Sequence, residues 1–179
     1  MSSLRLLGIC GSLRKGSFNR KLMLEAARLF DPAEFVDANL RLPLYDGDLE
    51  TEHGIPPEVQ LLADQIRDAD AVVIAGPEYI KALSGVLKNA LDWVSRTKGG
   101  PWRDKPVAIV SAAAGRAGGE RTQMTLRHAM VAFRPRILQG PEVFIAAPDK
   151  EFDADGRLVN GMPVKLLTEL MGELRRAAS

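Results

Sequence analysis

Gly8–Asn19, with the sequence GICGSLRKGSFN, decides the fold of this chain. The stretch begins inside the apolar run Leu4–Cys10 and leads into a helical pattern that ends at Phe30, so it connects a strand to a helix. Backbone N–H groups at such a helix N-terminus lack intrahelical acceptors, and the helix dipole favours an anion there. The sequence therefore predicts a phosphate-binding loop.

The same loop supplies hydrogen-bond donors from its side chains. Hydroxyls, an amide and a guanidinium are offered by Ser12, Ser17, Asn19 and Arg14. Gly11 and Gly16 allow a ligand to approach the backbone where a side chain would block it. The alternative interpretation is an ordinary Gly/Ser-rich turn, which the spacing alone does not distinguish from a binding loop.

Two known nucleotide-binding motifs do not match this loop, and their absence limits which phosphate ligand it could hold. Gly11 and Gly16 have the spacing of a P-loop, but Ser17 stands where that motif places the lysine that grips a triphosphate. The dinucleotide fingerprint is also missing, because its three spaced glycines do not occur, although Asp37 resembles the expected ribose-binding acid. With the triphosphate and dinucleotide motifs excluded, a monophosphate such as FMN remains the candidate ligand.

Length and composition favour one compact domain over residues 1–179. The chain has 46% apolar and 26% charged residues, and its net charge of +1 provides no field to gather nucleic acid or a membrane surface. One cysteine excludes an internal disulfide, and two histidines leave no case for a metal site. The N-terminus lacks the apolar core of a signal peptide, and no apolar run is long enough for a bilayer, so we expect a cytoplasmic protein.

Strand and helix patterns alternate along the chain. Strands are expected at 4–10, 34–40, 71–75 and 107–110 and within 137–146, and helices at 19–30, 56–66, 84–94, 120–133 and 162–176. Residues 41–54 are too polar and too interrupted to predict an element. Parallel strands need crossover helices, so the pattern indicates an α/β fold with a parallel sheet between two helical layers.

Three loops follow strands in this arrangement, at residues 12–19, 77–81 and 111–119. Ligands of such sheets bind beyond the carboxyl ends of the strands. The first loop is suited to a phosphate, and the small residues of the third leave room for a flat group against the backbone. Together the loops predict a site for a phosphate that carries a planar ring.

Two stretches resemble the NAD(P)H-dependent FMN reductase family, which includes quinone, chromate and azo-dye reductases. They are Gly11–Asn19 and Pro77-Glu78-Tyr79 with the following Gly85–Trp93 (GVLKNALDW). The resemblance implies a flavodoxin-like three-layer sandwich with a five-stranded parallel sheet of order 2-1-3-4-5. It implies bound FMN, and hydride transfer from NADPH or NADH through the flavin to a quinone, chromate, azo compound or free flavin. It also implies a homodimer or homotetramer.

Carried over by position, the resemblance implies phosphate contacts from Ser12, Arg14, Ser17 and Asn19. Residues around the ring system would be Pro77, Glu78, Tyr79, Ile80, Ser111 and Gly115, and Gly11 and Phe18 complete the predicted cofactor-binding set. No catalytic side chain is expected, because the flavin supplies the reactive atom. The chain departs from the family at Ile80, where members commonly have Asn, and at Ala112–Ala114, which replace more polar residues.

Other functions remain compatible with these patterns. A flavodoxin-like electron carrier, or a flavin-binding regulatory module, would share the loops without NAD(P)H turnover. An enzyme that reduces free FMN as a substrate would share them without retaining the flavin. Cys10 ends an apolar strand, and we expect a small core residue there rather than a reactive thiol.

Overall fold

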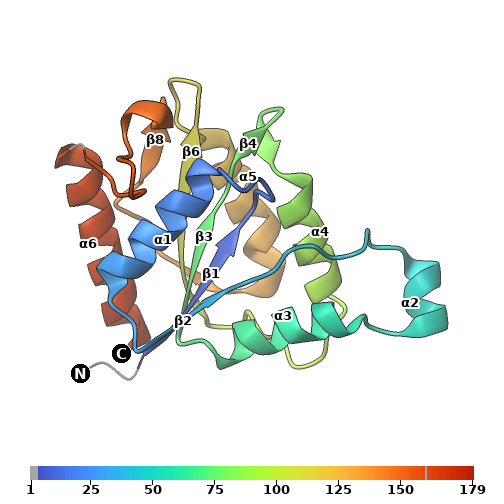
Figure 1. Ribbon diagram of the computed structural model, residues 1–179. Coiled ribbons are helices and arrows are strands. Elements are labelled where there is room, and N and C mark those ends of the chain that lie inside the picture. Colours follow the sequence, from blue (N-terminus) through green and yellow to red (C-terminus); the bar gives the residue numbers. More distant parts are fainter. Residues whose placement is uncertain (1–3, 160) are drawn as a thin grey trace.

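A parallel β-sheet forms the centre of the molecule in a computed structural model that describes residues 4–159 and 161–179 (Figure 1). Its strands have the order β2-β1-β3-β6-β7, and β8 also pairs with β6. Their bounds are β1 Arg5–Cys10, β2 Glu34–Asp37, β3 Ala71–Ala75, β6 Pro106–Ala113, β7 Arg136–Ile137 and β8 Phe144–Ala146. The predicted order of five strand positions and their parallel direction are confirmed.

Helices cover both faces of this sheet. On one face lie α1 (Phe18–Phe30) and α6 (Gly161–Ala178), which contact each other. On the other lie α3 (Pro57–Asp68), α4 (Gly85–Val94) and α5 (Glu120–Met130). The predicted three-layer, flavodoxin-like architecture is confirmed.

The alternation of side chains along β1 explains why both faces need a helical layer. Leu6 and Cys10 pack with the helices of one face, and Leu7 and Ile9 pack with those of the other. Burying one such aliphatic side chain contributes about 1.5–3 kcal/mol. The two apolar faces therefore hold the central strands in register, with their carboxyl ends at one edge.

The fifth strand position of the sheet is filled by two short strands, β7 and β8. The sequence predicted a single strand within 137–146. β7 pairs with the beginning of β6, and β8 pairs with its end, from Ser111↔Phe144 to Ala113↔Ala146. Pro141 lies between them and has no N–H to donate to a strand ladder. The division lets the chain after β8 reach the carboxyl edge of the sheet.

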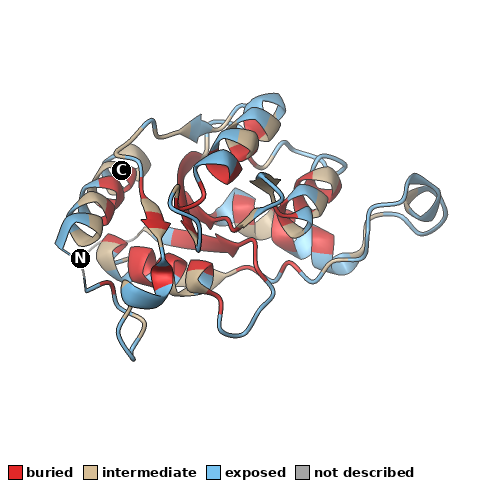
Figure 2. Ribbon diagram, turned by 90° about the horizontal axis from the view of Figure 1, so that it is seen from above, coloured by how far each residue is buried: buried red, intermediate tan, exposed pale blue. Residues whose placement is uncertain are grey.

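A short helix, α2 (Gly47–His53), corrects the expectation that residues 41–54 contain no element. Asp46 caps it by accepting a hydrogen bond of 2.9 Å from the N–H of Asp48. The segment 42–54, which we call the arm, projects from the body, and no residue of α2 is buried (Figure 2). Nε1 of Trp93 in α4 donates to the carbonyl of Pro43 at 2.8 Å, so the arm is held by a contact across 50 positions that no local pattern reveals.

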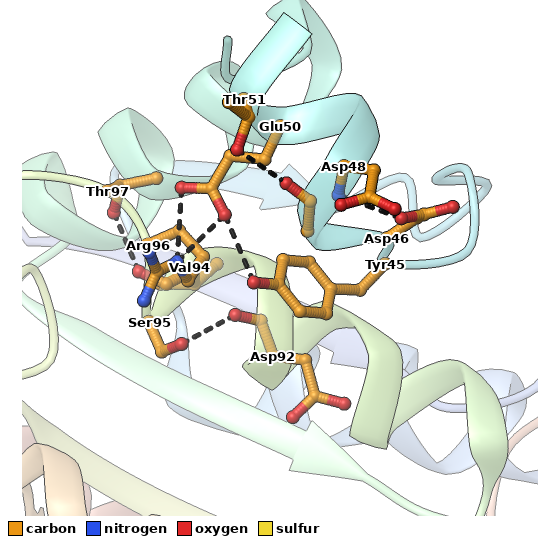
Figure 3. Close-up of polar contacts among 11 residues, drawn as sticks. Tyr45, Asp46, Asp48, Glu50, Thr51, Asp92, Val94, Ser95, Arg96 and Thr97 are labelled. Carbon is orange, nitrogen blue, oxygen red and sulfur yellow. Dashed lines mark hydrogen bonds and ion pairs between the residues drawn. The ribbon is translucent and has the colours of Figure 1, made fainter.

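Glu50 fastens the arm to the end of α4 (Figure 3). Its Oε2 accepts hydrogen bonds from the Tyr45 hydroxyl at 3.1 Å and from Nε of Arg96 at 2.9 Å. The hydrogen bond from Arg96 is the main cause that lowers the pKa of Glu50 below its ordinary value. The Tyr45 ring meets Trp93 edge-on, at 5.0 Å between centroids. The arm is thus ordered by polar and aromatic contacts rather than by the core.

Short elements complete the chain. The hairpin β4 (Glu78–Tyr79) and β5 (Ala82–Leu83) follows β3, and the 3₁₀ helices η1 (Val131–Phe133) and η2 (Pro148–Lys150) follow α5 and β8. None of the described helices combines the length and the apolar character needed to cross a bilayer.

Candidate functional site

A pocket of about 450 Å³ opens where the three predicted loops meet at the carboxyl edge of the sheet. We call it the loop pocket. Its lining comes from four segments of the chain: Ser12, Arg14 and Ser17–Asn19, then Pro77–Tyr79, then Ala112–Ala114, and finally Pro148 and Asp149. Of the predicted site residues, all but Gly11, Ile80, Ser111 and Gly115 line it.

The first loop presents free donors to this pocket. Ser17 caps α1, because its Oγ accepts a hydrogen bond of 3.3 Å from the N–H of Arg20. The N–H groups of Phe18 and Asn19 have no acceptor among the described residues. Together with the helix dipole and the exposed guanidinium of Arg14, they make this end of the pocket suitable for a phosphate.

Asn19 joins the first loop to the third. Its Nδ2 donates to the carbonyl of Ala112 at 2.8 Å, and its Oδ1 accepts from the N–H of Ala112 at 2.9 Å. The side chain is only 4% exposed. Because both ends of the amide are engaged, the predicted phosphate contact of Asn19 rests on its backbone N–H, and the amide serves to connect two loops.

Ser84 joins the first loop to the second. Its Oγ donates to the carbonyl of Gly11 at 2.7 Å and accepts from the N–H of Leu87, which caps α4. A Cβ on Gly11 would lie 2.6 Å from Cδ1 of Leu87. Gly11 therefore does not line the pocket, and its small size lets α4 pack directly against the first loop.

Glu78 ties the second loop to α5. Its carboxylate accepts a hydrogen bond of 3.1 Å from the N–H of Arg121 and pairs with the guanidinium of the same residue at 3.4 Å. The N–H of Leu83 donates to the hydroxyl of Thr125 at 2.8 Å. The β4–β5 hairpin thus rests on α5 at both of its strands.

Ile80 and Lys81 form the tip of this hairpin. Both have positive φ, 47° and 62°, in a two-residue turn of the kind that favours Asn-Gly. A β-branched residue in this region is a conformational outlier. Ile80 is 97% exposed and stands outside the loop pocket, while its neighbour Tyr79 lines it.

Ser111 supports the third loop from below. It is fully buried, its Oγ donates to the carbonyl of Gly118 at 2.8 Å, and Nε2 of Gln123 donates to it at 3.0 Å. Gly118 and Gly119 have φ of 57° and 93°, and a Cβ on either would lie 2.8 Å from β8 or from Ser111. Neither Ser111 nor Gly115 lines the pocket, so their predicted ring contacts stay predictions.

Pro148 and Asp149 were not predicted as site residues. They follow β8, whose pairing with the end of β6 brings them beside Ala112–Ala114. They could have been predicted from the position of the loop after the last strand, because the loops that follow parallel strands all lie at the same edge of the sheet. Further along this segment, Phe152 stacks on Phe18 with 5.9 Å between ring centroids.

Cys10 lies behind the first loop, and burial raises the pKa of its thiol. Its Sγ donates to the carbonyl of Ser12 at 3.5 Å. Within the described ranges, no group of three His, Cys, Asp or Glu side chains is arranged to hold a metal ion. The chemistry that this edge of the sheet offers is therefore anion binding beside a flat, small-residue wall.

The known proteins that this chain matches in sequence include several reductases. The sequence profile of the NADPH-dependent FMN reductase family matches residues 4–149. An NAD(P)H-dependent FMN reductase of Pseudomonas aeruginosa is 41% identical, and the match covers 96% of this chain and 94% of that protein. A quinone reductase of Escherichia coli is 41% identical over 78% of this chain and 76% of its own length.

The fold agrees with these matches. The flavoenzyme FerB of Paracoccus denitrificans, an NAD(P)H:(acceptor) oxidoreductase, superimposes with a TM-score of 0.88 at 30% identity, over 98% of this chain and 97% of that one. The predicted family and the predicted enzyme class are thereby confirmed. This chain belongs to the NADPH-dependent FMN reductase family.

Proposed function

We propose that the loop pocket binds FMN and that the enzyme passes a hydride from NADPH or NADH through this flavin to a small electron acceptor. One observation carries the proposal. Three loops that are far apart in sequence line a single pocket, to which the first loop contributes phosphate donors and the third contributes small side chains. Hydrogen bonds from Asn19 and Ser84 join these loops to one another.

The phosphate end would be held by charged and neutral donors. The hydroxyls of Ser12 and Ser17, the guanidinium of Arg14 and the N–H groups of Phe18 and Asn19 all belong to the pocket wall. None of the described residues accepts a hydrogen bond from those two N–H groups. A ribityl phosphate would satisfy them, which is the fit expected for FMN.

The ring end would be formed by the second and third loops. Pro77 and Tyr79 line the pocket from the second loop, and Ala112–Ala114 line it from the third. The small side chains let a flat ring approach the backbone, while the hydrogen bonds of Glu78 to Arg121 keep the second loop in place. These residues would orient the ring and limit the access of water.

Bound FMN supplies the two-electron chemistry, so the protein needs no nucleophile of its own. The side chains around the pocket bind, orient and shield. Arg14 and the start of α1 provide positive electrostatic potential at the phosphate.

Quinones are the acceptor class that we propose first. An Escherichia coli relative carries the name quinone reductase, and an Arabidopsis thaliana relative the name NADPH:quinone oxidoreductase. The exposed Ile80 beside Tyr79 offers an apolar contact to a flat acceptor and no hydrogen bond to an oxyanion such as chromate. Azo compounds and free flavin share the flat shape and are the next candidates.

We also propose that the enzyme works as a homodimer or homotetramer. The arm exposes the apolar side chains of Leu44, which is 81% exposed, and Leu49. Light scattering coupled to size-exclusion chromatography measures the mass, and a mass of 19.5 kDa for the native species would contradict this proposal.

Rapid mixing of the FMN-loaded protein with NADPH tests the function. We expect the flavin absorbance to bleach within the turnover time and to recover when a quinone is added. A protein that stays yellow would be an electron carrier or a regulatory flavin-binding module, and the proposal would be wrong. Loss of the flavin during purification, with turnover of added FMN, would make FMN a substrate instead.

A further inference from the structure

A second pocket lies on the other side of the first loop. Its volume is about 440 Å³, and it opens between the first loop and the chain that follows β2. We call it the β2-side pocket. It shares only Ser12 and Arg14 with the loop pocket, and its remaining lining is Cys10, Leu13, Lys15, Arg20 and Asp37–Arg41. The first loop is therefore the wall between two cavities.

Positive charge is concentrated in the β2-side pocket. Lys15, Arg20 and Arg41 line it in addition to Arg14, whereas Asp37 is the one acidic residue in the lining that the structure describes. The whole chain has a net charge of only +1, so this concentration is local. Four cations around a cavity attract an anion with more than one negative charge.

Asp37 gives the pocket a second recognition element. It ends β2, opposite Gly8 of β1, and its carboxylate pairs with the guanidinium of Arg20. Its Oδ1 is buried and accepts no hydrogen bond among the described residues. An acidic residue at the end of the second strand is the group that binds ribose hydroxyls in dinucleotide-binding sheets, and Asp37 has unused acceptor capacity for such a hydroxyl.

The rest of the lining fits the remaining part of a nucleotide. Leu13, Ala38 and Leu40 supply apolar surface in the same pocket. A volume of this size holds more than an inorganic phosphate, since pockets for small organic ligands span roughly 300–1,000 Å³. A base against the leucines, a ribose at Asp37 and a phosphate at the basic side chains would use every part of the lining.

We propose that the β2-side pocket binds a phosphorylated ribose, separately from the flavin site. Two sources carry this chemistry: the adenosine portion of the NADPH donor and a free adenine nucleotide that acts as a regulator. The first source rests on the proposed function, and the second does not. The binding itself depends on residues outside the loop pocket, with Lys15, Arg41 and Asp37 as its main contacts.

Calorimetric titration of the FMN-loaded protein with adenosine 2′,5′-bisphosphate tests the proposal. Lys15 is exposed and makes no described hydrogen bond, so Lys15→Ala removes charge without disturbing the loop. We expect affinity to fall about tenfold in Lys15→Ala and again in Arg41→Ala, as for the loss of one charge-assisted contact. Lys98→Ala, at an exposed lysine beyond the end of α4, is the matched control and should bind like wild type. Equal affinity in all four proteins, or no binding to wild type at millimolar concentration, would overturn the proposal.

Asp37→Ala separates ribose recognition from simple charge attraction. The variant removes the acceptor for a ribose hydroxyl and leaves the cations in place. We expect inorganic phosphate to bind at least as well as to wild type, whereas the preference for the nucleotide over inorganic phosphate falls several-fold. An unchanged preference would show that Asp37 does not contact the ribose and would contradict this part of the proposal.

Competition with NADPH identifies the source. If adenosine 2′,5′-bisphosphate raises the KM for NADPH in proportion to its occupancy of the pocket, the pocket holds part of the donor. If it binds without changing that KM, the pocket holds a separate nucleotide. Should flavin binding itself fail, the titration of the FMN-free protein still reports on this pocket through Lys15→Ala, because Lys15 lies outside the loop pocket.

Discussion

The hydrogen bonds of Asn19 and Ser84 that join the loops beneath the loop pocket, which we call its floor, contrast with the tip of the β4–β5 hairpin. On the floor, Asn19 and Ser84 are buried and have their polar atoms hydrogen-bonded to the backbone of other loops. At the tip, Ile80 and Lys81 are exposed and hold positive φ without a glycine. One region is fixed by buried polar contacts, and the other carries conformational strain in solvent.

The difference assigns different tasks to the two regions. A floor that is held by hydrogen bonds within the protein reduces the ordering cost of binding, as a site for a resident cofactor requires. A strained and exposed apolar residue persists only where the surrounding structure holds it, and such outliers cluster at functional sites. We therefore expect substitutions on the floor to change stability and substitutions at the tip to change acceptor choice.

Asn19→Ala breaks the floor most severely. It leaves the buried N–H and C=O of Ala112 without their partner, which costs about 2–5 kcal/mol. Thermal unfolding followed by circular dichroism should show a Tm lower by roughly 5–15 °C for a chain of this size. Asn39→Ala, at an exposed asparagine whose side chain accepts a hydrogen bond from the N–H of Arg41, is the control and should change Tm little. Equal shifts in the two variants would contradict the structural role of Asn19.

Arg14→Ala tests the phosphate site at a residue of the first loop that belongs to neither the floor nor the tip. The guanidinium is exposed, so its loss should leave Tm unchanged, but one charge-assisted phosphate contact is worth about 1.5–3 kcal/mol. Fluorescence titration should show FMN affinity lowered at least about tenfold. Arg103→Ala, at an exposed arginine before β6, should bind FMN like wild type. Undiminished affinity in Arg14→Ala would rule out the assigned phosphate site.

Ser84→Ala breaks the floor at its second junction. The substitution removes the cap of α4 and the donor to Gly11, and we expect a loss of about 1–2 kcal/mol in the free energy of unfolding. Urea denaturation measures it. Ser95→Ala, where the exposed hydroxyl bonds the carbonyl of Asp92, should cost much less, and the comparison fails if the two costs agree.

Ile80→Asn sharpens the role of the tip. Asparagine tolerates positive φ, so the variant should be slightly more stable, and its amide should favour a hydrated oxyanion over a quinone. We expect the quinone-to-chromate ratio of kcat/KM to fall about fivefold, or on the order of 1 kcal/mol. Ile80→Val keeps the apolar side chain and should keep the ratio. A ratio that stays constant or rises in Ile80→Asn would mean that Ile80 contacts something other than the acceptor.

The thiol of Cys10 should have the smallest effect of these predictions, on the pH dependence of stability. Burial raises the pKa of its thiol above the ordinary value near 9.0. The unfolded chain therefore loses this proton at lower pH than the folded chain does, and stability should decline as pH rises above about 9. Cys10→Ala should lack this component when unfolding is compared at pH 8 and pH 10. Rapid reaction of the native thiol with a disulfide reagent at pH 8 would contradict the buried, protonated state.

Much of the lining of the loop pocket could be predicted because its signals are local. The Gly/Ser-rich turn before α1 and the apolar runs of β1 and β3 are visible within a few residues, and parallel strands place their loops at one edge. The partners of Asn19 and Ser84 could not be predicted, because they lie 93 and 73 positions away. For the same reason α2 was missed, since Asn89, Trp93 and Arg96 in and after α4 order the arm.

Local sequence patterns were sufficient to predict the alternation of strands and helices, and the family resemblance supplied the strand order. The turn before α1 predicts a phosphate-binding loop, which stays a prediction. Periodic burial and helix-terminal donors are properties of short segments, so they can be read from short segments. Tertiary packing shows that the side chains of Asn19 and Ser111 brace the loops, because both ends of the Asn19 amide bond to Ala112 and Ser111 lies outside the lining of the loop pocket. It also divided the last strand and set a second, basic pocket behind the first loop. These outcomes depend on which distant backbone atoms meet a side chain, and that is settled only when the layers pack.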